Sequence, residues 1–265
     1  MKKVVIIGGG ISGLTAAVYG AKAGLDVTLF EQHTIPGGEC TGWDRDGYHI
    51  DNCIHWMMGT TPGSQLYDLW KTVGALEEES LIFRIPAMYT SELGEQRLTL
   101  WQDVDRTERE MIALSPGDKK EIRRLLRFCR SAQRVQIPAD IPSELMGPRD
   151  GLRMLWSSSG ALKIFRAFRG MNVQDLMERF SHPLIRLLIS DFTPADSQAG
   201  SFVMAYGNFL SGDGGIPAGG SRAMAFRMAK KARSLGAKIV TGKAVQKILA
   251  DQAKGQADGV LLADG

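Results

Sequence analysis

The sequence has little cysteine, little histidine and almost no excess charge. Its 265 residues include three cysteines and four histidines, and the formal net charge is +3. Three cysteines suggest no disulfide framework and fit a reducing compartment. The small net charge gives no support to nucleic-acid binding. No apolar stretch is long enough to span a bilayer, so we expect a cytoplasmic location, with peripheral membrane contact left open.

A metal site is not expected either. Cys53 and His55 lie close together in the sequence, but the chain has no C-x-x-C pair and few histidines, so the two are not expected to be metal ligands. Hydrophobic residues make up 44% of the chain and charged residues 23%, a composition typical of globular proteins. The length allows one large domain or two ordinary ones.

The N-terminal stretch predicts a dinucleotide-binding βαβ unit. Four β-branched residues at 4–7 indicate a buried parallel strand. The spacing G-x-G-x-x-G follows at Gly8, Gly10 and Gly13. The three glycines would allow a tight turn, a close approach of backbone to a diphosphate, and packing of a helix on the strand. The start of that helix, at Ile11 and Ser12, would present free N–H groups to the phosphates.

An acidic residue stands where such a unit needs one. A second strand, 27–30, ends at Glu31, and Gln32 follows it. A carboxylate roughly 20 residues beyond the glycines can accept hydrogen bonds from the ribose hydroxyls of an adenosine. A glycine-rich loop that binds nothing is the alternative, but the βαβ context favours dinucleotide binding.

A second glycine pair makes the pattern more specific. Pro36-Gly37-Gly38 follows Glu31 at a short distance. The combination resembles the FAD-dependent amine oxidases, phytoene desaturases and protoporphyrinogen oxidases. In that group the pair lies against the FAD phosphates, where a side chain would collide with the cofactor, so FAD is favoured over NAD. The group usually has Arg or Lys next, and Glu39 departs from this, so no cofactor role is assigned to it.

The run Cys53-Ile54-His55-Trp56 follows a predicted hairpin around Gly47. It resembles the branch that is related to phytoene dehydrogenase and includes carotenoid isomerases and retinol saturase. The resemblance implies that the run lies in the pocket of the isoalloxazine ring, with His55 and Trp56 near the flavin. His55 is the candidate catalytic residue, as a proton donor or by setting the polarity there; packing beneath the cofactor is the alternative.

The expected fold class is α/β. Residues 1–80 and 211–265 would form an FAD/NAD(P)-binding Rossmann-like domain, and residues 81–210 an inserted, mostly helical α+β region for substrate. The chain would re-enter the nucleotide domain through a helix from about Ser221 to Leu235, with Ser221 as its N-cap; a flavin contact by Gly220 or Arg222 is the alternative. The resemblance also implies that the backbone of Val245 meets the adenine.

Basic and aromatic side chains are mixed in two stretches, 116–134 and 145–168. Helices of this kind can lie in a membrane interface. They can equally present a solvated basic face above a buried apolar one, which is the favoured interpretation.

The resemblance implies an FAD-dependent desaturase, saturase or isomerase that acts on C–C bonds of an apolar, polyene or isoprenoid-like substrate, with the flavin carrying the redox step. It covers only the N-terminal part of that family, because nothing after Leu249 matches its second flavin-contacting motif. We therefore expect a fragment or a truncated form, completed by a homodimer or by a complementing C-terminal partner. The alternatives are an amine oxidase-like flavoenzyme acting on C–N bonds and a non-catalytic nucleotide-binding subunit.

Overall fold

The computed structural model describes residues 1–51, 53–135, 143–151, 159–251 and 255–265. Asn52 and part of the predicted basic stretch 145–168 therefore lie outside the described residues. The chain divides into two compact units, and each is described by itself. Unit 1 comprises Met1–Met57, Pro62–Phe83 and Ile216–Gly265, and unit 2 comprises Met58–Thr61 and Arg84–Gly215.

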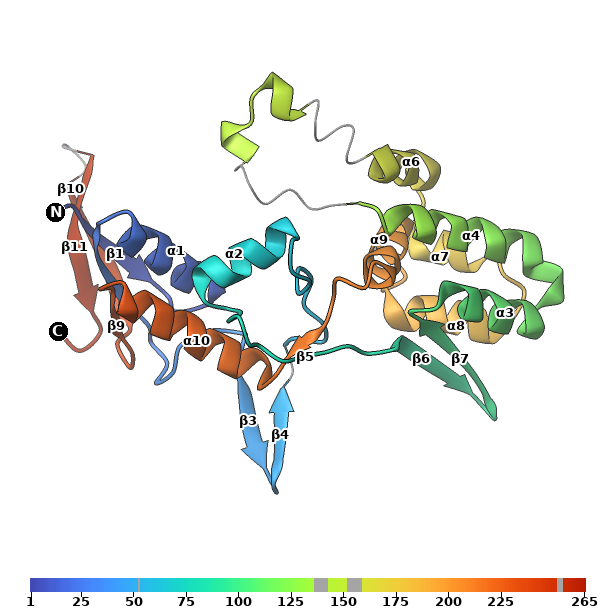
Figure 1. Ribbon diagram of the computed structural model, residues 1–265, viewed down its shortest axis with the longest axis horizontal. Helices are drawn as coiled ribbons and strands as arrows, with labels where there is room; N and C mark the ends of the chain where they lie inside the picture. Colours follow the sequence, from blue (N-terminus) through green and yellow to red (C-terminus); the bar gives the residue numbers. More distant parts are fainter. Residues whose placement is uncertain (52, 136–142, 152–158, 252–254) are drawn as a thin grey trace. The chain divides into compact units, whose positions relative to one another are not determined.

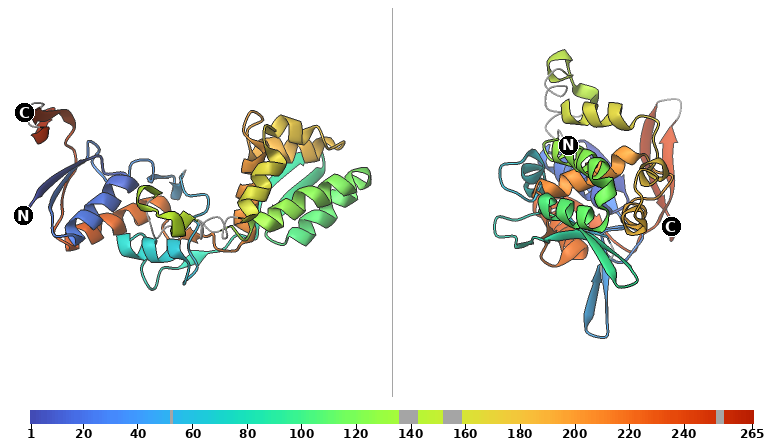
Figure 2. Two further views of the ribbon diagram at one scale, coloured as in Figure 1. Left: turned by 90° about the horizontal axis from the view of Figure 1, so that it is seen from above. Right: turned by 90° about the vertical axis from the view of Figure 1, so that its right-hand side faces the viewer.

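A three-stranded parallel sheet with the order β1-β2-β9 is the framework of unit 1 (Figure 1). Its strands are β1 (Lys3–Ile7), β2 (Asp26–Phe30) and β9 (Lys238–Val240). Helix α1 (Ile11–Lys22) connects β1 to β2, and α10 (Gly220–Ser234) leads into β9. The two helices lie side by side (Figures 1 and 2).

One face of this sheet is buried beneath the helices. Val27 and Leu29 of β2 are almost fully buried, in one cluster with Leu14 of α1 and Met228 of α10. The alternation within a strand directs every second side chain the other way. On that other face, Val5 of β1 is 41% exposed. The apolar run at 4–7 predicted a strand buried on both faces, but helices cover only one face of β1.

The rest of unit 1 consists of paired strands and one helix. Helix α2 (Gln65–Val73) begins at Ser64, whose hydroxyl accepts a bond from the Tyr67 N–H, and ends at Gly74 in the left-handed conformation. The antiparallel pairs are β3 (Gly42–Arg45) with β4 (Tyr48–Asp51), β5 (Ile82–Phe83) with β8 (Ile216–Pro217), and β10 (Val245–Asp251) with β11 (Gln256–Leu262).

Unit 2 is mostly helical around one antiparallel hairpin. The hairpin joins β6 (Ala87–Leu93) to β7 (Gln96–Trp101). The helices are α3 (Val104–Leu114), α4 (Lys119–Ala132), α6 (Ser159–Phe168), α7 (Val173–Met177), α8 (Pro183–Phe192) and α9 (Ala199–Leu210), with short 3-10 turns at Pro116–Asp118 and Ser143–Leu145. None of the helices within the described ranges is long and apolar enough to cross a bilayer.

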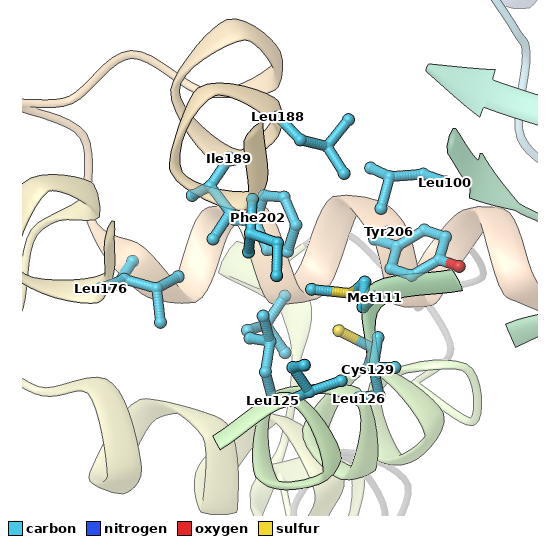
Figure 3. Close-up of a cluster of buried hydrophobic side chains, with 14 of the residues drawn as sticks. Leu100, Met111, Leu125, Leu126, Cys129, Leu176, Leu188, Ile189, Phe202 and Tyr206 are labelled. Carbon is cyan, nitrogen blue, oxygen red and sulfur yellow. The ribbon is translucent and has the colours of Figure 1, made fainter. Parts of the chain in front are cut away.

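The core of unit 2 lies between α4, α8 and α9 (Figure 3). Helix α4 places Leu125, Leu126 and Cys129 on its buried side because their spacing follows the helical period. Phe202 and Tyr206 of α9 are fully enclosed beside them. The hydroxyl of Tyr206 lies 2.7 Å from the carbonyl oxygen of Trp101, so this polar group is paired within the core.

Candidate dinucleotide site

The predicted glycine turn connects β1 to α1. Gly8 has a φ of 96°, a conformation that favours glycine, and its N–H donates to the carbonyl of Phe30 at 2.8 Å. A Cβ on Gly13 would lie 2.0 Å from the carbonyl oxygen of Gly8. Glycine at both positions therefore lets the helix begin directly against the end of the strand.

The start of α1 is open. Gly10 is its N-cap, and no side chain among the described residues caps this end. Ile11 and Ser12 form the first turn, where backbone N–H groups have no partner within the helix. A Cβ on Gly10 would meet only the Cα of Gly38, at 4.0 Å, so backbone is accessible here. This is the geometry in which helix starts bind phosphate groups.

Glu31 links the end of β2 to the glycine turn. The residue is 7% exposed; its Oε2 accepts the Gly9 N–H at 2.5 Å and its Oε1 accepts the His33 N–H at 2.7 Å. A carboxylate oxygen can accept more than one hydrogen bond, so both retain capacity for a further donor. The adjacent Gln32 is exposed.

The second glycine pair lies against the first glycine loop. Gly37 forms a parallel bridge with Gly10 and donates its N–H to the carbonyl of Gly9 at 2.8 Å. A Cβ on Gly38 would stand 3.1 Å from the Cα of Gly10. A side chain at position 38 would therefore crowd the backbone of the first glycine loop. Glu39, the next residue, is exposed.

The segment that follows β9 joins this edge of unit 1. Lys243 donates its backbone N–H to the carbonyl of Glu31 at 2.9 Å, and Gly242 donates to that of His33 at 2.8 Å. Val245, two residues further on, begins β10 and pairs with Leu262. The structure therefore brings the chain around Val245 to the same strand end as Glu31.

The run at 53–56 lies beside the start of α10. Ile54 donates its N–H to the Ser221 hydroxyl at 2.9 Å. His55 is exposed and Trp56 is half-buried. The part of His55 in a flavin site stays a prediction.

The prediction that Ser221 is an N-cap is wrong. The N-cap of α10 is Gly219, with a φ of 79°, and Ser221 lies inside the helix. Its N–H and hydroxyl both donate to the Asp51 carboxylate, at 2.5 Å and 2.7 Å. Asp51, which is distant in the sequence, therefore accepts a hydrogen bond from a backbone N–H group in the first turn of α10. Arg222 donates to the carbonyl of Gly42 at 3.2 Å.

Asp51 is the residue that sequence reasoning missed. Burial would raise the pKa of its carboxyl, but hydrogen bonds from the Ser221 hydroxyl and from the N–H groups of Ser221 and Cys53 outweigh this and lower it. Nothing in the residues around Asp51 marks such a role. Across the described ranges, no three His, Cys, Asp or Glu side chains gather in a group that could hold a metal ion.

Comparisons with known proteins agree with this geometry. The family described as an NAD(P)-binding Rossmann-like domain matches residues 6–73. Hydroxyneurosporene desaturase from Rubrivivax gelatinosus is 30% identical over 203 residues, which are 68% of this chain and 37% of that protein. The 4,4'-diaponeurosporene oxygenase of Staphylococcus aureus strain Mu50 is 24% identical over 255 residues, 93% of this chain and 50% of that protein. The chain thus spans half or less of the length of these relatives.

Solved structures show the same fold. An oxidoreductase from Methanosarcina mazei aligns with the whole chain and 56% of its own, with a TM-score of 0.56 and 24% identity. Putrescine oxidase bound to putrescine aligns with 99% of this chain and 55% of its own, with a TM-score of 0.58 and 19% identity. At these identities the likeness establishes the fold alone.

The fold and the glycine-rich site define a Rossmann-like dinucleotide-binding protein, and the predicted α/β fold class is confirmed. The similarities agree with the resemblance to the amine oxidase-type FAD-dependent oxidoreductases: residues 6–73 match an NAD(P)-binding Rossmann-like domain, and the similar sequences are those of a hydroxyneurosporene desaturase and a 4,4'-diaponeurosporene oxygenase. FAD is the cofactor of that group, as the second glycine pair predicted.

Proposed function

We propose that this chain is the FAD-binding portion of an oxidoreductase that acts on C–C bonds of an apolar polyene. The names of two relatives support the substrate class, since one desaturates hydroxyneurosporene and the other oxygenates 4,4'-diaponeurosporene. Bound FAD would supply the hydride acceptor, and the protein would supply binding, orientation and exclusion of water.

The residues that would hold FAD fall into groups along one edge of the parallel sheet and at the start of α10. Gly8, Gly10, Ile11, Ser12 and Gly13 would bind the diphosphate with Gly37 and Gly38. Glu31 and Gln32 would bind the ribose, Val245 the adenine, and His55 and Trp56 the flavin ring. Backbone accessible at Gly10 and remaining acceptor capacity on Glu31 fit this cofactor.

The contact between Glu31 and Gly9 is the observation on which the proposal depends. It holds an acceptor for sugar hydroxyls directly beside the backbone that would bind phosphate. Replacing Glu31 by alanine removes charged hydrogen bonds, each of which contributes about 1.5–3 kcal/mol. Glu31→Ala should therefore weaken FAD binding by at least about tenfold.

The test is a titration of the purified full chain with FAD, followed by flavin fluorescence. Glu39→Ala is the matched control, because Glu39 is an exposed carboxylate in the next loop, and it should bind FAD as the parent does. Glu31→Gln keeps the size of the side chain and separates loss of binding from loss of folding, which thermal melting monitors. Equal affinity of Glu31→Ala and the parent would contradict the proposed site.

The substrate class has its own readout. The FAD-loaded chain is mixed without oxygen with an acyclic polyene in detergent, or with putrescine. Bleaching of the flavin absorbance by the polyene alone supports action on C–C bonds. Bleaching by putrescine alone supports the amine oxidase-like alternative. No bleaching by either, with FAD bound, supports a non-catalytic subunit.

Membrane contact is part of the same proposal, because an apolar polyene would be collected from lipid. Helix α6 supports it. Phe165 is 64% exposed and Leu162 is 40% exposed, while the neighbouring Lys163, Arg166 and Arg169 are exposed as well. Exposed apolar groups with basic neighbours are what interfacial helices present to anionic lipid. A homodimer or a complementing C-terminal partner stays a prediction.

A further inference from the structure

Two of the three cysteines lie in contact. The sulfur atoms of Cys40 and Cys53 are 3.4 Å apart in unit 1, and both side chains are half-buried. Cys129 is fully buried in the core of unit 2. Neither of the paired cysteines is itself assigned to FAD binding, although both lie close to residues that are.

Backbone contacts fix both partners. Cys40 donates its N–H to the carbonyl of Gly37 at 3.0 Å, and a Cβ on Gly37 would come within 2.5 Å of the Cys40 carbonyl oxygen. Cys53 donates its N–H to Oδ1 of Asp51 at 3.0 Å. Each cysteine is therefore held in place by hydrogen bonds to residues two or three positions before it. The two side chains point toward each other, so that their sulfur atoms are in contact.

We propose that Cys40 and Cys53 form a peroxide-sensitive dithiol that closes to an intramolecular disulfide and reopens with thiol reductants. Disulfide formation needs two sulfur atoms close together, and the 3.4 Å between these two meets that requirement. The proposal does not depend on FAD binding, because it concerns only the two thiols and the oxidant.

The chemistry balances with hydrogen peroxide as the oxidant. One sulfur attacks a peroxide oxygen, the O–O bond breaks, and a sulfenic acid and water result. The second sulfur attacks the first, the S–O bond breaks, and a second water leaves. Two thiols have then lost two electrons and two protons, and one peroxide has become two waters. Two molecules of a reducing thiol return the electrons and protons and become a disulfide themselves.

The surroundings of Cys40 affect how its oxidation depends on pH. Burial, together with the adjacent Cys53 thiol, raises the pKa of the Cys40 thiol. Thiolate is the reactive form, so closure of the disulfide should become faster as the pH rises.

The experiment exposes the reduced full chain to hydrogen peroxide, then counts thiols in denaturant and measures the intact mass. The thiol count should fall from three to one, the mass should fall by about 2 Da, and dithiothreitol should reverse both changes. A peptide map without reductant should join the segments that contain Cys40 and Cys53.

Two variants sharpen the test. Cys129→Ser should still lose two thiols, since the buried core cysteine takes no part. Cys53→Ser should form no internal disulfide, and thermal melting shows whether it remains folded. Parent protein that keeps three thiols, gains about 16 Da without a cross-link, or links Cys129 would overturn the proposal.

Discussion

At the scale of single residues, Asp51 makes contacts in unit 1 that no local sequence pattern predicts. Its carboxylate accepts bonds from the N–H and hydroxyl of Ser221 and from the N–H of Cys53. These bonds connect the end of β4 to the start of α10. They also place a negative charge at the positive end of a helix dipole, where it is stabilised.

Replacing Asp51 by asparagine should lower the free energy of unfolding at neutral pH by about 1–2 kcal/mol, since a charged acceptor is lost. The folded state lowers the pKa of Asp51 below its ordinary 3.8. The stabilisation is therefore complete above that value and is lost as the pH falls through the lowered pKa. The free energies of urea unfolding of the parent and Asp51→Asn should differ by a constant amount between about pH 6 and 8, and the difference should begin to shrink below about pH 4.

The exposed carboxylate of Asp258 provides the matched control. Asp258→Asn should have the same free energy of unfolding as the parent at neutral pH, within about 0.5 kcal/mol. A stability difference for Asp51→Asn that persists unchanged at about pH 3 would contradict a charged Asp51 and indicate that the loss comes from packing.

Residues that obey local rules could be predicted, and those that depend on distant contacts could not. Gly8 and Glu31 follow from the spacing of a turn and of a strand end. Ser221 was predicted as an N-cap because a serine after glycines is favoured there. The actual partner of the helix start, Asp51, is 170 residues away, and no rule on neighbouring residues connects the two.

At the scale of elements, the packing of α4 on α9 depends on one missing side chain. A Cβ on Gly207 would lie 2.2 Å from the Cβ of Ala132 and 2.8 Å from the carbonyl oxygen of Cys129. Both helices are held in place by the surrounding core, so neither can move away without loss of packing. Glycine sets how closely these helices approach.

Gly207→Ala should therefore destabilise unit 2 by about 1–3 kcal/mol, although alanine is the better helix former. Gly200→Ala in the same helix is the matched control, because its Cβ would meet atoms only at 3.8 Å and beyond. That control should be neutral or gain about 0.5 kcal/mol. Denaturant unfolding of the two variants compares them, and equal stability would contradict the close contact.

The ends of helices and strands agree with the sequence where it contains capping residues or a turn signal. Ser64 and Gly74 enclose α2 as capping preferences predict, and the hairpin turns at Gly47. The pairing of β5 with β8 could not be predicted, because each is a strand of two residues and shows no period.

At the scale of the whole molecule, the chain passes between the two units at 57/58, 61/62, 83/84 and 215/216. Three of the segments at these points are joined within unit 2. Arg84 donates to the carbonyl oxygens of Gly212 and Gly214, at 2.5 Å and 2.9 Å, and the Asp213 carboxylate accepts the N–H groups of Gly59 and Thr61. The charged side chains of Arg84 and Asp213 thus hold together segments that are far apart in the sequence. No sequence pattern predicts these contacts.

The proposed membrane contact involves the exposed apolar face of α6. Phe165 on α6 should enter the lipid interface, where burial of an aromatic side chain contributes about 2 kcal/mol. Phe165→Glu should therefore weaken binding to liposomes that contain phosphatidylglycerol by about thirtyfold. Co-sedimentation of the full chain at low salt measures this, and higher salt should weaken the parent's binding.

Tyr48→Glu is the control for the added negative charge, because Tyr48 is an aromatic residue that is 75% exposed on a hairpin of unit 1. If α6 is the contact, Tyr48→Glu should bind liposomes within about twofold of the parent. A parent chain that stays in the supernatant, or equal losses in both variants, would mean that the apolar face of α6 is not a lipid-binding surface. The basic residues of α6 would then form the solvated face that the sequence also allowed.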